Sequence, residues 1–430
     1  MRDIALSMLI LGLIPLIIAQ PYIGVLAWSW LGYMNPHRLT YGFAYGLPWV
    51  QIVALLTMAG MFYAREKWAP PSCTITWLIA ALLFWTGVTT VFAFSGDAAW
   101  ASFEKFVKIQ AMILATLVLV RGQTKIHWLV VVIAFSIGFY GIKGGVFTVL
   151  TGGGNRVLGP AGSFITDNNA LALALCIVLP LFRYMHLQAT KRWARAGLML
   201  CMILITLAVL ATYSRGGMLG LAAVGFFLIL KSRKRASFLI VALLAIPLLL
   251  SVMPDKWANR MNTITSYQTE GSAVSRIESW RFAINLGLDR PALGGGFGVA
   301  THSSTFWRYA PPNASKPRAV HSIFFQVLAE QGFVGLGLFL GLLVAGWRAC
   351  NAVRRQTADD PANKWAYDLS SMLQVSLVAY AVAGAFLPLP YFDLVYQLLA
   401  IIALVRVQFA TQPAATAAKR SGVRGVQATP

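Results

Sequence analysis

Long apolar runs with few charged residues recur along the whole chain and predict its secondary structure. A helix needs roughly 20 apolar residues to cross a hydrocarbon core of about 30 Å, and most of the runs approach that length. They lie at residues 4–34, 46–63, 74–95, 103–120, 127–150, 168–184, 195–213, 216–230, 236–253, 321–347, 366–387 and 391–409. The pattern predicts an all-α polytopic membrane protein with about twelve transmembrane helices, and the absence of alternating strands of about ten residues excludes an outer-membrane barrel.

Composition supports a membrane protein. Of the 430 residues, 58% are hydrophobic and 11% are charged, whereas soluble domains carry about 25% charged residues. A soluble enzyme is therefore excluded. The cysteines all lie inside or at the ends of apolar runs, so they predict neither a disulfide framework nor a cysteine metal site; they are Cys73, Cys176, Cys201 and Cys350.

The first apolar run allows two interpretations. Pro15 and the pair Gln20-Pro21 interrupt residues 4–34, so this run forms either one broken crossing or two short ones. No small-residue cleavage site follows it, and we expect the segment to be retained rather than removed as a signal peptide. A single crossing places both basic ends of the chain in the cytoplasm, which is the topology we expect.

Basic residues in alternate connections predict which ends of the helices face the cytoplasm. The connections expected inside contain Arg65, Lys67, Arg121, Lys125, Arg183, Lys191, Arg192, Arg195, Lys231, Arg233, Lys234, Arg235, Arg348, Arg354, Arg355 and Lys364. The remaining connections then lie outside, and the largest of them is residues 254–320. The chain is predicted to comprise nine transmembrane helices in residues 1–253, a periplasmic loop with helical segments in 254–320, three further helices in 321–410 and a disordered cytoplasmic tail in 411–430.

Basic residues on the outer side need a separate explanation, because the rule that favours positive charge inside does not account for them. They include Arg38, Lys143, Arg156, Arg215, Lys256, Arg260, Arg276, Arg281, Arg290, Arg308, Lys316 and Arg318. A net charge of +21 would suggest nucleic acid in a soluble protein, but in a membrane protein it predicts lipid contact, and nucleic acid is not expected as a partner. An external basic cavity for an anionic ligand is the interpretation we favour.

Two residues at the outer boundary are the first candidates for chemistry. Arg215 begins an apolar run beside two glycines, and His321 opens another directly after the long loop. Arginine binds anions, and histidine is the side chain best suited to accept a proton near neutral pH. The alternatives are an arginine that extends to water and a histidine that caps a helix. Glu330, inside the apolar run, is expected to pair with a basic residue or a polar helix face, and Gly332 and Gly335 to allow close helix packing.

Further candidates lie in two polar segments on the same side. If residues 272–298 contain a helix, Arg276 and Trp280 share one of its faces and Arg281 lies beside them. Arginine holds phosphate oxygens and tryptophan stacks on the apolar faces of sugar rings, although an amphipathic interfacial helix would have the same pattern. The second segment, which is rich in glycine, contributes the candidate binding residues Arg156, Asn168 and Asn169.

The motifs that the sequence lacks limit the chemistry. It contains no Asp-x-Asp, no Walker motif and no His-Glu-x-x-His motif, so we expect no bound metal and no cofactor. Any reaction would then be driven by the leaving group of the substrate.

Two short motifs resemble the bacterial O-antigen ligase family, which belongs to a wider group with O-antigen polymerases and protein O-oligosaccharyltransferases. One is Arg-x3-Leu, here Arg215 to Leu219, and the other is His-[Asn/Ser/Gln]-x9-Gly-x-x-Gly, here His321 to Gly335. A large loop before the last three helices also resembles this family. Residues 21–45 are in addition similar to O-glycosylation ligases of exosortase systems, so the acceptor stays open.

The resemblance implies an inner-membrane glycosyltransferase with a GT-C-like helical fold. Its donor would be a polysaccharide linked to undecaprenyl pyrophosphate, its acceptor a hydroxyl of the lipid A-core, and its partners these substrates and membrane lipids. Transfer would occur on the periplasmic face with inversion and without metal. His321 would be the base, and Arg215 and Arg276 would bind the pyrophosphate. A transporter of lipid-linked sugars is the alternative from a different class, and it would explain Lys143 better.

Overall fold

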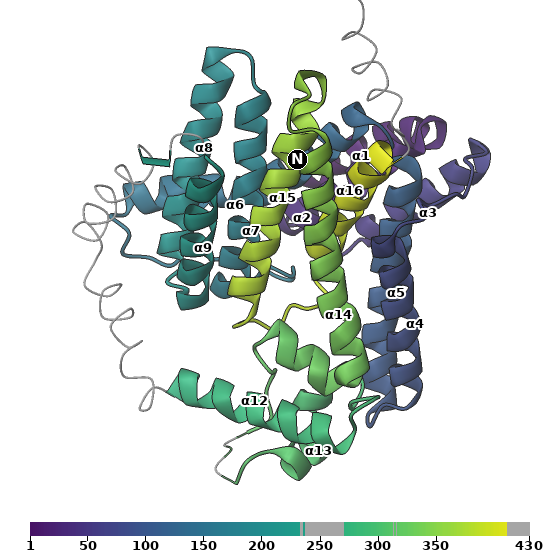
Figure 1. Cartoon of the computed structure of the whole chain (residues 1–430), viewed down its shortest axis with the longest axis vertical. Coiled ribbons are helices and arrows are strands. Elements are labelled where there is room, and N and C mark those ends of the chain that lie inside the picture. The colour runs from purple at the N-terminus through teal and green to yellow at the C-terminus, as the bar shows by residue number, and fades with distance from the viewer. Residues whose placement is uncertain (233–234, 237–270, 313, 315, 411–430) are drawn as a thin grey trace, which may run out of the picture.

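The computed structural model describes residues 1–232, 235–236, 271–312, 314 and 316–410, and this part of the chain is helical throughout, without a strand (Figure 1). The α-helices are α1 (Arg2–Ala19), α2 (Pro21–Met34), α3 (Trp49–Tyr63), α4 (Thr74–Val91), α5 (Gly96–Leu119), α6 (Gln123–Leu150), α7 (Asn168–Gln188), α8 (Arg192–Ala211), α9 (Arg215–Lys231), α12 (Gly271–Asp289), α13 (Ser303–Tyr309), α14 (Ile323–Gln356), α15 (Lys364–Gly384) and α16 (Asp393–Ala410). Short 3-10 helices η1 (Pro36–Leu39), η2 (Phe43–Tyr45), η3 (Val299–Thr301) and η4 (Pro361–Asn363) lie in the connections. The predicted all-α class is confirmed.

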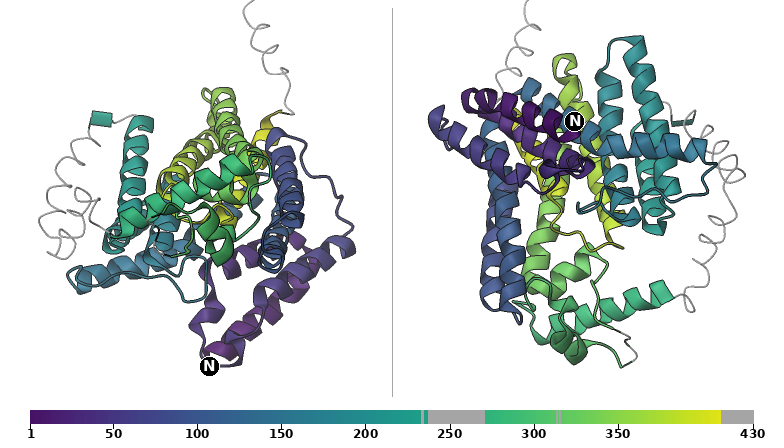
Figure 2. Two further views of the ribbon diagram at one scale, coloured as in Figure 1. Left: turned by 90° about the horizontal axis from the view of Figure 1, so that it is seen from below. Right: turned by 180° about the vertical axis from the view of Figure 1, so that it is seen from behind.

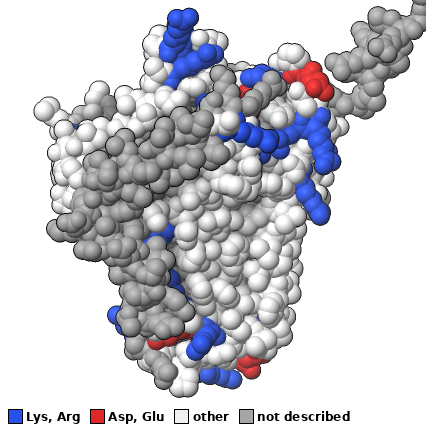
Figure 3. All heavy atoms as spheres, turned by 60° about the vertical axis from the view of Figure 1, so that its left-hand side comes forward, with Lys and Arg blue, Asp and Glu red and all other residues white. Residues whose placement is uncertain are grey.

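In the described residues, 7 helices are long and apolar enough to cross a membrane, namely α1, α4, α6, α7, α8, α14 and α16. Their positions agree with the predicted apolar runs, while the predicted run at 236–253 lies almost entirely outside the described residues. Figure 3 shows most Lys and Arg side chains of one face gathered toward its two ends, with a broad band that has few charged side chains between them, where grey atoms do not cover the face. Such a band is what a hydrocarbon layer requires, because a charged side chain facing lipid is energetically costly.

The single crossing predicted for residues 4–34 is wrong. The chain breaks between α1 and α2 at Gln20, which is followed by Pro21 at the first helical position. The Asp3 carboxylate at the start of α1 accepts hydrogen bonds from the backbone N–H groups of Gly42 (3.0 Å) and Ala44 (3.1 Å), which follow α2. Both ends of the α1–α2 pair therefore lie on the same side of the fold. The cytoplasmic position of Met1, which rested on a single crossing, is no longer supported.

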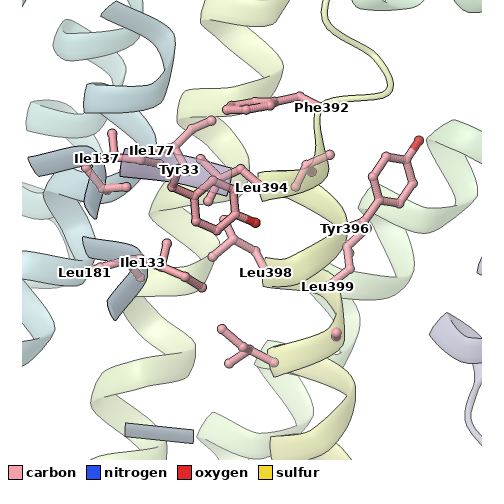
Figure 4. Packing of buried hydrophobic residues seen from close by; sticks show 14 of the residues in the cluster. Tyr33, Ile133, Ile137, Ile177, Leu181, Phe392, Leu394, Tyr396, Leu398 and Leu399 are labelled. Atoms are coloured by element: carbon pink, nitrogen blue, oxygen red, sulfur yellow. The ribbon is translucent and has the colours of Figure 1, made fainter. Parts of the chain in front are cut away.

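The centre of the bundle is formed by α7, α15 and α16. In the most apolar 18-residue window of each helix, 83% of α7 and 78% of α16 is buried, compared with 17% of α1 and 22% of α8. Figure 4 shows Tyr33 of α2 between Ile133 and Ile177 on one side and Leu394 and Leu398 of α16 on the other. The apolar faces of α1 and α8 are left exposed, as expected for helices that contact lipid.

A separate layer covers one end of the bundle. Figure 1 shows α12 and α13 below the long helices, and Figure 2, in its view from below, shows this green layer in front of the bundle. The layer has its own small apolar core, which includes Phe282, Phe306 and Tyr309 together with Ala329 of α14. The α14–α15 connection lies at the opposite end in Figure 1. The layer thus packs on the first turns of α14, directly after His321.

Candidate active site

His321 lies at the junction between the layer and α14, in an uncommon backbone conformation. Its φ angle is 51°, in the left-handed region that residues other than glycine seldom adopt. The next residue, Ser322, is extended and is the N-cap of α14. Tyr213, two residues before Arg215, has a similar φ of 57°. Each family motif therefore begins at or just after a left-handed turn that leads into a helix, and such conformations persist only where the surrounding structure holds them.

Charged groups from separate elements act on His321. Burial lowers the pKa of His321, and the positive charges of Arg276 on α12 and of Arg318 lower it further, while the carboxylate of Asp167 acts in the opposite direction. At neutral pH the imidazole is therefore uncharged and has a lone pair available to accept a proton. His321 belongs to a motif and Arg276 to the predicted helix of the loop, and the charge of Arg276 acts on His321 in the fold.

Arg318 and Asp167 belong to this cluster but were not among the predicted site residues. The Arg318 guanidinium is 3.7 Å from the Glu278 carboxylate of α12, and the two side chains are only 16% and 12% exposed. Asp167 caps α7 by accepting hydrogen bonds from the backbone N–H groups of Asn169 (2.8 Å) and Ala170 (3.2 Å). Its role as a helix cap could have been predicted from its place before Asn168, but its approach to His321 could not.

Arg215 is held at the first position of α9 by close helix contacts. Ser214 caps the helix by accepting a hydrogen bond from the Gly217 N–H (3.0 Å). A Cβ at Gly217 would lie 2.5 Å from that of Ala172 on α7, and a Cβ at Gly220 would lie 2.8 Å from that of Ala383 on α15. Only glycine allows these approaches, so the start of α9 is fixed against both α7 and α15.

The glycine-rich segment and the start of α7 support the turn before Arg215. The Asn168 side chain donates to the Thr212 carbonyl oxygen (2.8 Å), and the Tyr213 hydroxyl donates to the Gly153 carbonyl oxygen (2.7 Å). The Arg156 guanidinium lies 5.8 Å from the centre of the Tyr213 ring. Asn169 donates to the Asn168 side chain (3.4 Å). These contacts place Arg156, Asn168 and Asn169 around the Tyr213–Arg215 turn, where they shape the backbone.

Trp280 connects this turn to the layer. Helix α12 is present, so Arg276 and Trp280 are one turn apart on one face, as predicted. The Trp280 ring stacks on Phe325 of α14 with centres 5.2 Å apart, and its centre is 6.3 Å from that of Phe386. Phe386 in turn lies next to Gly216, because a Cβ added to Gly216 would be 3.4 Å from the Phe386 Cβ. Phe325 thus occupies one face of the Trp280 indole. The side chain of Arg281, the next residue along α12, is exposed.

The second motif contains a break in α14 at Gly332. This residue has φ 66° and ψ −171°, which interrupts the helix. A side chain there would overlap the Ala292 carbonyl, so the position requires glycine for space as well as for conformation. We expected Gly332 to allow close packing of helices, but the segment that packs against it is a loop. Gly335 does face another helix, because a Cβ there would lie 3.3 Å from Trp85 of α4.

A glycine-rich turn at residues 294–298, which we call the glycine turn, occupies this break. The Gly295 N–H donates to the Ala329 carbonyl (2.8 Å) and the Gly296 N–H to the Glu330 carbonyl (2.9 Å). The Phe333 N–H donates to the Pro291 carbonyl (2.7 Å). These bonds satisfy backbone groups that the break would otherwise leave unpaired. They also connect the loop that follows α12 to the part of α14 before the break, which begins directly after His321 and Ser322.

Glu330 is part of the same connection. Its carboxylate is 4% exposed and accepts hydrogen bonds from the Gly298 N–H (3.0 Å) and from the Gln326 side chain (3.1 Å). Its partners include a backbone amide, a polar side chain on the same helix and the Tyr391 side chain. Of the two expectations for this residue, a polar helix face agrees with the structure.

The arrangement has the components of a group-transfer site for an anionic leaving group. A neutral imidazole lies beside guanidinium groups at one end of a helical bundle, and Arg215 begins a helix near aromatic residues that contact the same layer. Arginines in such a setting can hold phosphate oxygens in fixed geometry, while the imidazole can accept a hydroxyl proton.

Comparison with protein families confirms the resemblance found in the motifs. Residues 199–340 match the family model described as O-antigen ligase, and this segment contains both motifs and α12. Residues 1–190 match a family of unknown function (DUF5935). No curated protein matches the chain.

Proposed function

We propose, taking the O-antigen ligase match of residues 199–340 as the premise, that the protein is an O-antigen ligase. It would transfer a finished polysaccharide from undecaprenyl pyrophosphate to a hydroxyl of the lipid A-core, on the periplasmic face of the bacterial inner membrane. The family match supports activity of the ligase and polymerase group in general. The donor, the acceptor and the side of the membrane are proposals.

In the proposed reaction, the acceptor oxygen attacks the anomeric carbon of the donor from the face opposite the pyrophosphate. The new bond from carbon to the acceptor oxygen forms as the bond to the pyrophosphate oxygen breaks, so the configuration inverts. The acceptor proton passes to the His321 imidazole, and undecaprenyl pyrophosphate leaves with the bonding electron pair. Arg276 and Arg215 would stabilise the negative charge that develops on it, so that no metal is required.

The observation that carries this proposal is the position of His321 among Arg276, Arg318 and Asp167. The proposed base lies directly before α14, and the groups that act on its pKa belong to α12, to the segment before α14 and to the N-cap of α7. Arg156, Asn168, Asn169, Trp280 and Arg281 are proposed to contribute to substrate binding, either directly or by supporting the turn before Arg215.

Deletion of the gene and analysis of the lipopolysaccharide tests the proposal. Loss of a ligase leaves bare lipid A-core and causes lipid-linked polymer to accumulate. Normal lipopolysaccharide in the deletion strain would exclude ligation as the role of this protein. Restoration by the wild type but not by His321→Ala, at equal membrane levels, would connect the phenotype with the proposed site.

A further inference from the structure

A pair of cationic side chains converges at the end of the bundle opposite the candidate site. Lys231 is the last residue of α9, and Arg354 lies near the end of α14. The Lys231 Nζ donates to the Gln374 Oε1 at 2.6 Å, and the Arg354 Nη1 donates to the same oxygen at 3.1 Å. One neutral amide oxygen of α15 thus holds two positive charges close together.

The positive charges of this pair are not neutralised by a carboxylate within the described residues. The described ion pairs do not include Lys231 or Arg354. Asp368, also on α15, is already bound by Lys364 (3.3 Å) and by Gln188 (2.9 Å). Two partly buried like charges repel each other, and an anion between them would remove that repulsion.

The remaining geometry of the pair favours a phosphate group as that anion. The Arg354 Nε is buried and has no hydrogen-bond partner. The Gln374 side chain is held in place because its amide nitrogen donates to the Asn351 Oδ1 (2.8 Å) and the Trp347 carbonyl oxygen (3.2 Å). A guanidinium with an unused donor beside an ammonium matches the several oxygens of a phosphate.

The position of the pair indicates a phospholipid as the source of the phosphate. The Lys231 ammonium lies 5.8 Å from the centre of the Trp347 ring, and the Arg354 guanidinium lies 5.3 Å from that of Tyr367. Tryptophan, tyrosine and snorkelling cations are typical of the membrane interface. Since α9 rises about 1.5 Å per residue from Arg215 to Lys231, the pair lies roughly 24 Å from the start of that helix. One headgroup cannot contact both ends.

We propose that Lys231 and Arg354, held together by Gln374, bind the phosphate of an anionic phospholipid in the leaflet opposite the candidate active site. The lipid would connect the ends of α9, α14 and α15. Because the same three helices position Arg215 and His321 at their other ends, the lipid would stabilise the bundle that carries the site. The proposal does not depend on the reaction that the site catalyses.

The test uses the full chain in detergent and measures the unfolding temperature and the lipid retained in native mass spectra. Phosphatidylglycerol, phosphatidylcholine and inorganic phosphate are the probes. We expect phosphatidylglycerol to raise the unfolding temperature and to be retained, and phosphatidylcholine to have little effect. Removal of both cations in Lys231→Met/Arg354→Met should weaken binding of phosphatidylglycerol by roughly tenfold per cation.

Arg348→Met/Arg355→Met is the matched control, since it removes the same charge from exposed side chains at the same end of α14. It should respond like the wild type. Gln374→Glu places a carboxylate between the cations, so it should stabilise the lipid-free protein and abolish the response, and it remains informative if the double variant does not fold. An equal response to inorganic phosphate would overturn the assignment to a lipid. Equal responses in the wild type, the double variant and Gln374→Glu would overturn the site itself.

Discussion

At the scale of single residues, His321 differs from an ordinary helix-capping histidine because charged groups of other elements act on it. General-base assistance typically accelerates a reaction by about 10² to 10⁴. We therefore expect His321→Ala to insert and to bind donor while losing transfer by a factor in that range. The measurement is transfer per folded molecule, with donor binding as the control. A helix cap would instead lose stability with turnover little changed.

The pH dependence of transfer reports the charges around His321. The base must be neutral, so kcat/KM should rise with pH, and because the pKa of His321 is lowered, the midpoint should lie below the ordinary histidine value of 6.5. Arg276→Gln removes a positive charge that lowers this pKa and should move the midpoint to higher pH. Asp167→Asn, which retains a good helix cap, should move it to lower pH. Shifts of the same sign in both variants would contradict the arrangement.

Charge alone should not be sufficient for the two proposed pyrophosphate ligands. Arginine binds phosphate oxygens through a planar fork, whereas lysine offers a single point charge. We expect Arg215→Lys and Arg276→Lys each to lose transfer by at least about tenfold at matched membrane levels, and Arg281→Lys, at an exposed position, to retain more activity. Full activity of Arg215→Lys would make that residue a structural cation.

Prediction of single residues from the sequence was possible where a motif was present and was limited where proximity arises from folding. Arg215 and His321 stand in recognisable motifs, and the spacing of Arg276 and Trp280 placed them on one helical face. Asp167 and Arg318 belong to no motif, and their effect on His321 depends on how the α7 cap and the segment before α14 pack in three dimensions. Only the structure reveals that relation.

At the scale of elements, hydrophobic length located the helices, but it could not reveal how they break or reverse. Pro15 and Gln20-Pro21 marked an interruption after α1, and only the contact of Asp3 with Gly42 and Ala44 shows that the chain turns back. The break in α14 is similar, because the unpaired backbone groups at Gly332 find their partners in the glycine turn, far away in the sequence.

The glycine turn should matter for the position of His321 as well as for stability. Gly332→Ala combines a strained φ with an overlap at the Ala292 carbonyl, and we expect it to lower the free energy of unfolding by about 1–3 kcal/mol. Gly337→Ala, with no atom near its added Cβ, is the control and should be neutral or slightly stabilising. Thermal unfolding in detergent compares the two. Equal stability of both variants would argue against a strained break at Gly332.

Glu330 offers a second comparison within the same element. Its carboxylate accepts from the Gly298 N–H, and the amide oxygen of glutamine can do the same. If Glu330 only holds the glycine turn, Glu330→Gln should keep near-normal transfer, while Glu330→Leu should lose it. Loss in Glu330→Gln with a displaced pH profile would instead make this carboxylate part of the proton transfer.

At the scale of the whole molecule, the distribution of charge and the contacts of the N-terminus together specify a topology. The layer of α12 and α13 and the start of α14 lie at one end, and the α14–α15 connection with its basic residues lies at the other. Basic connections favour the cytoplasm, so the layer is predicted to be periplasmic. Because Met1 lies beside the connection after α2, the N-terminus is predicted to share the side of residues 35–45, which the charge pattern assigns to the periplasm.

Cysteine labelling of intact cells with a reagent that does not cross the inner membrane tests this topology. The native cysteines are replaced first, and single cysteines are introduced at Tyr41, Ser303 and Arg355, whose side chains are exposed. Tyr41→Cys and Ser303→Cys should label from outside, while Arg355→Cys should label only after the membrane is opened, since a helix such as α14 separates the two ends by a bilayer thickness. Labelling of Ser303→Cys only in opened cells would place His321 in the cytoplasm, where the proposed periplasmic transfer could not occur. Opposite results for Tyr41→Cys and Ser303→Cys would leave that transfer possible but would contradict the assignment of residues 35–45 to the periplasm.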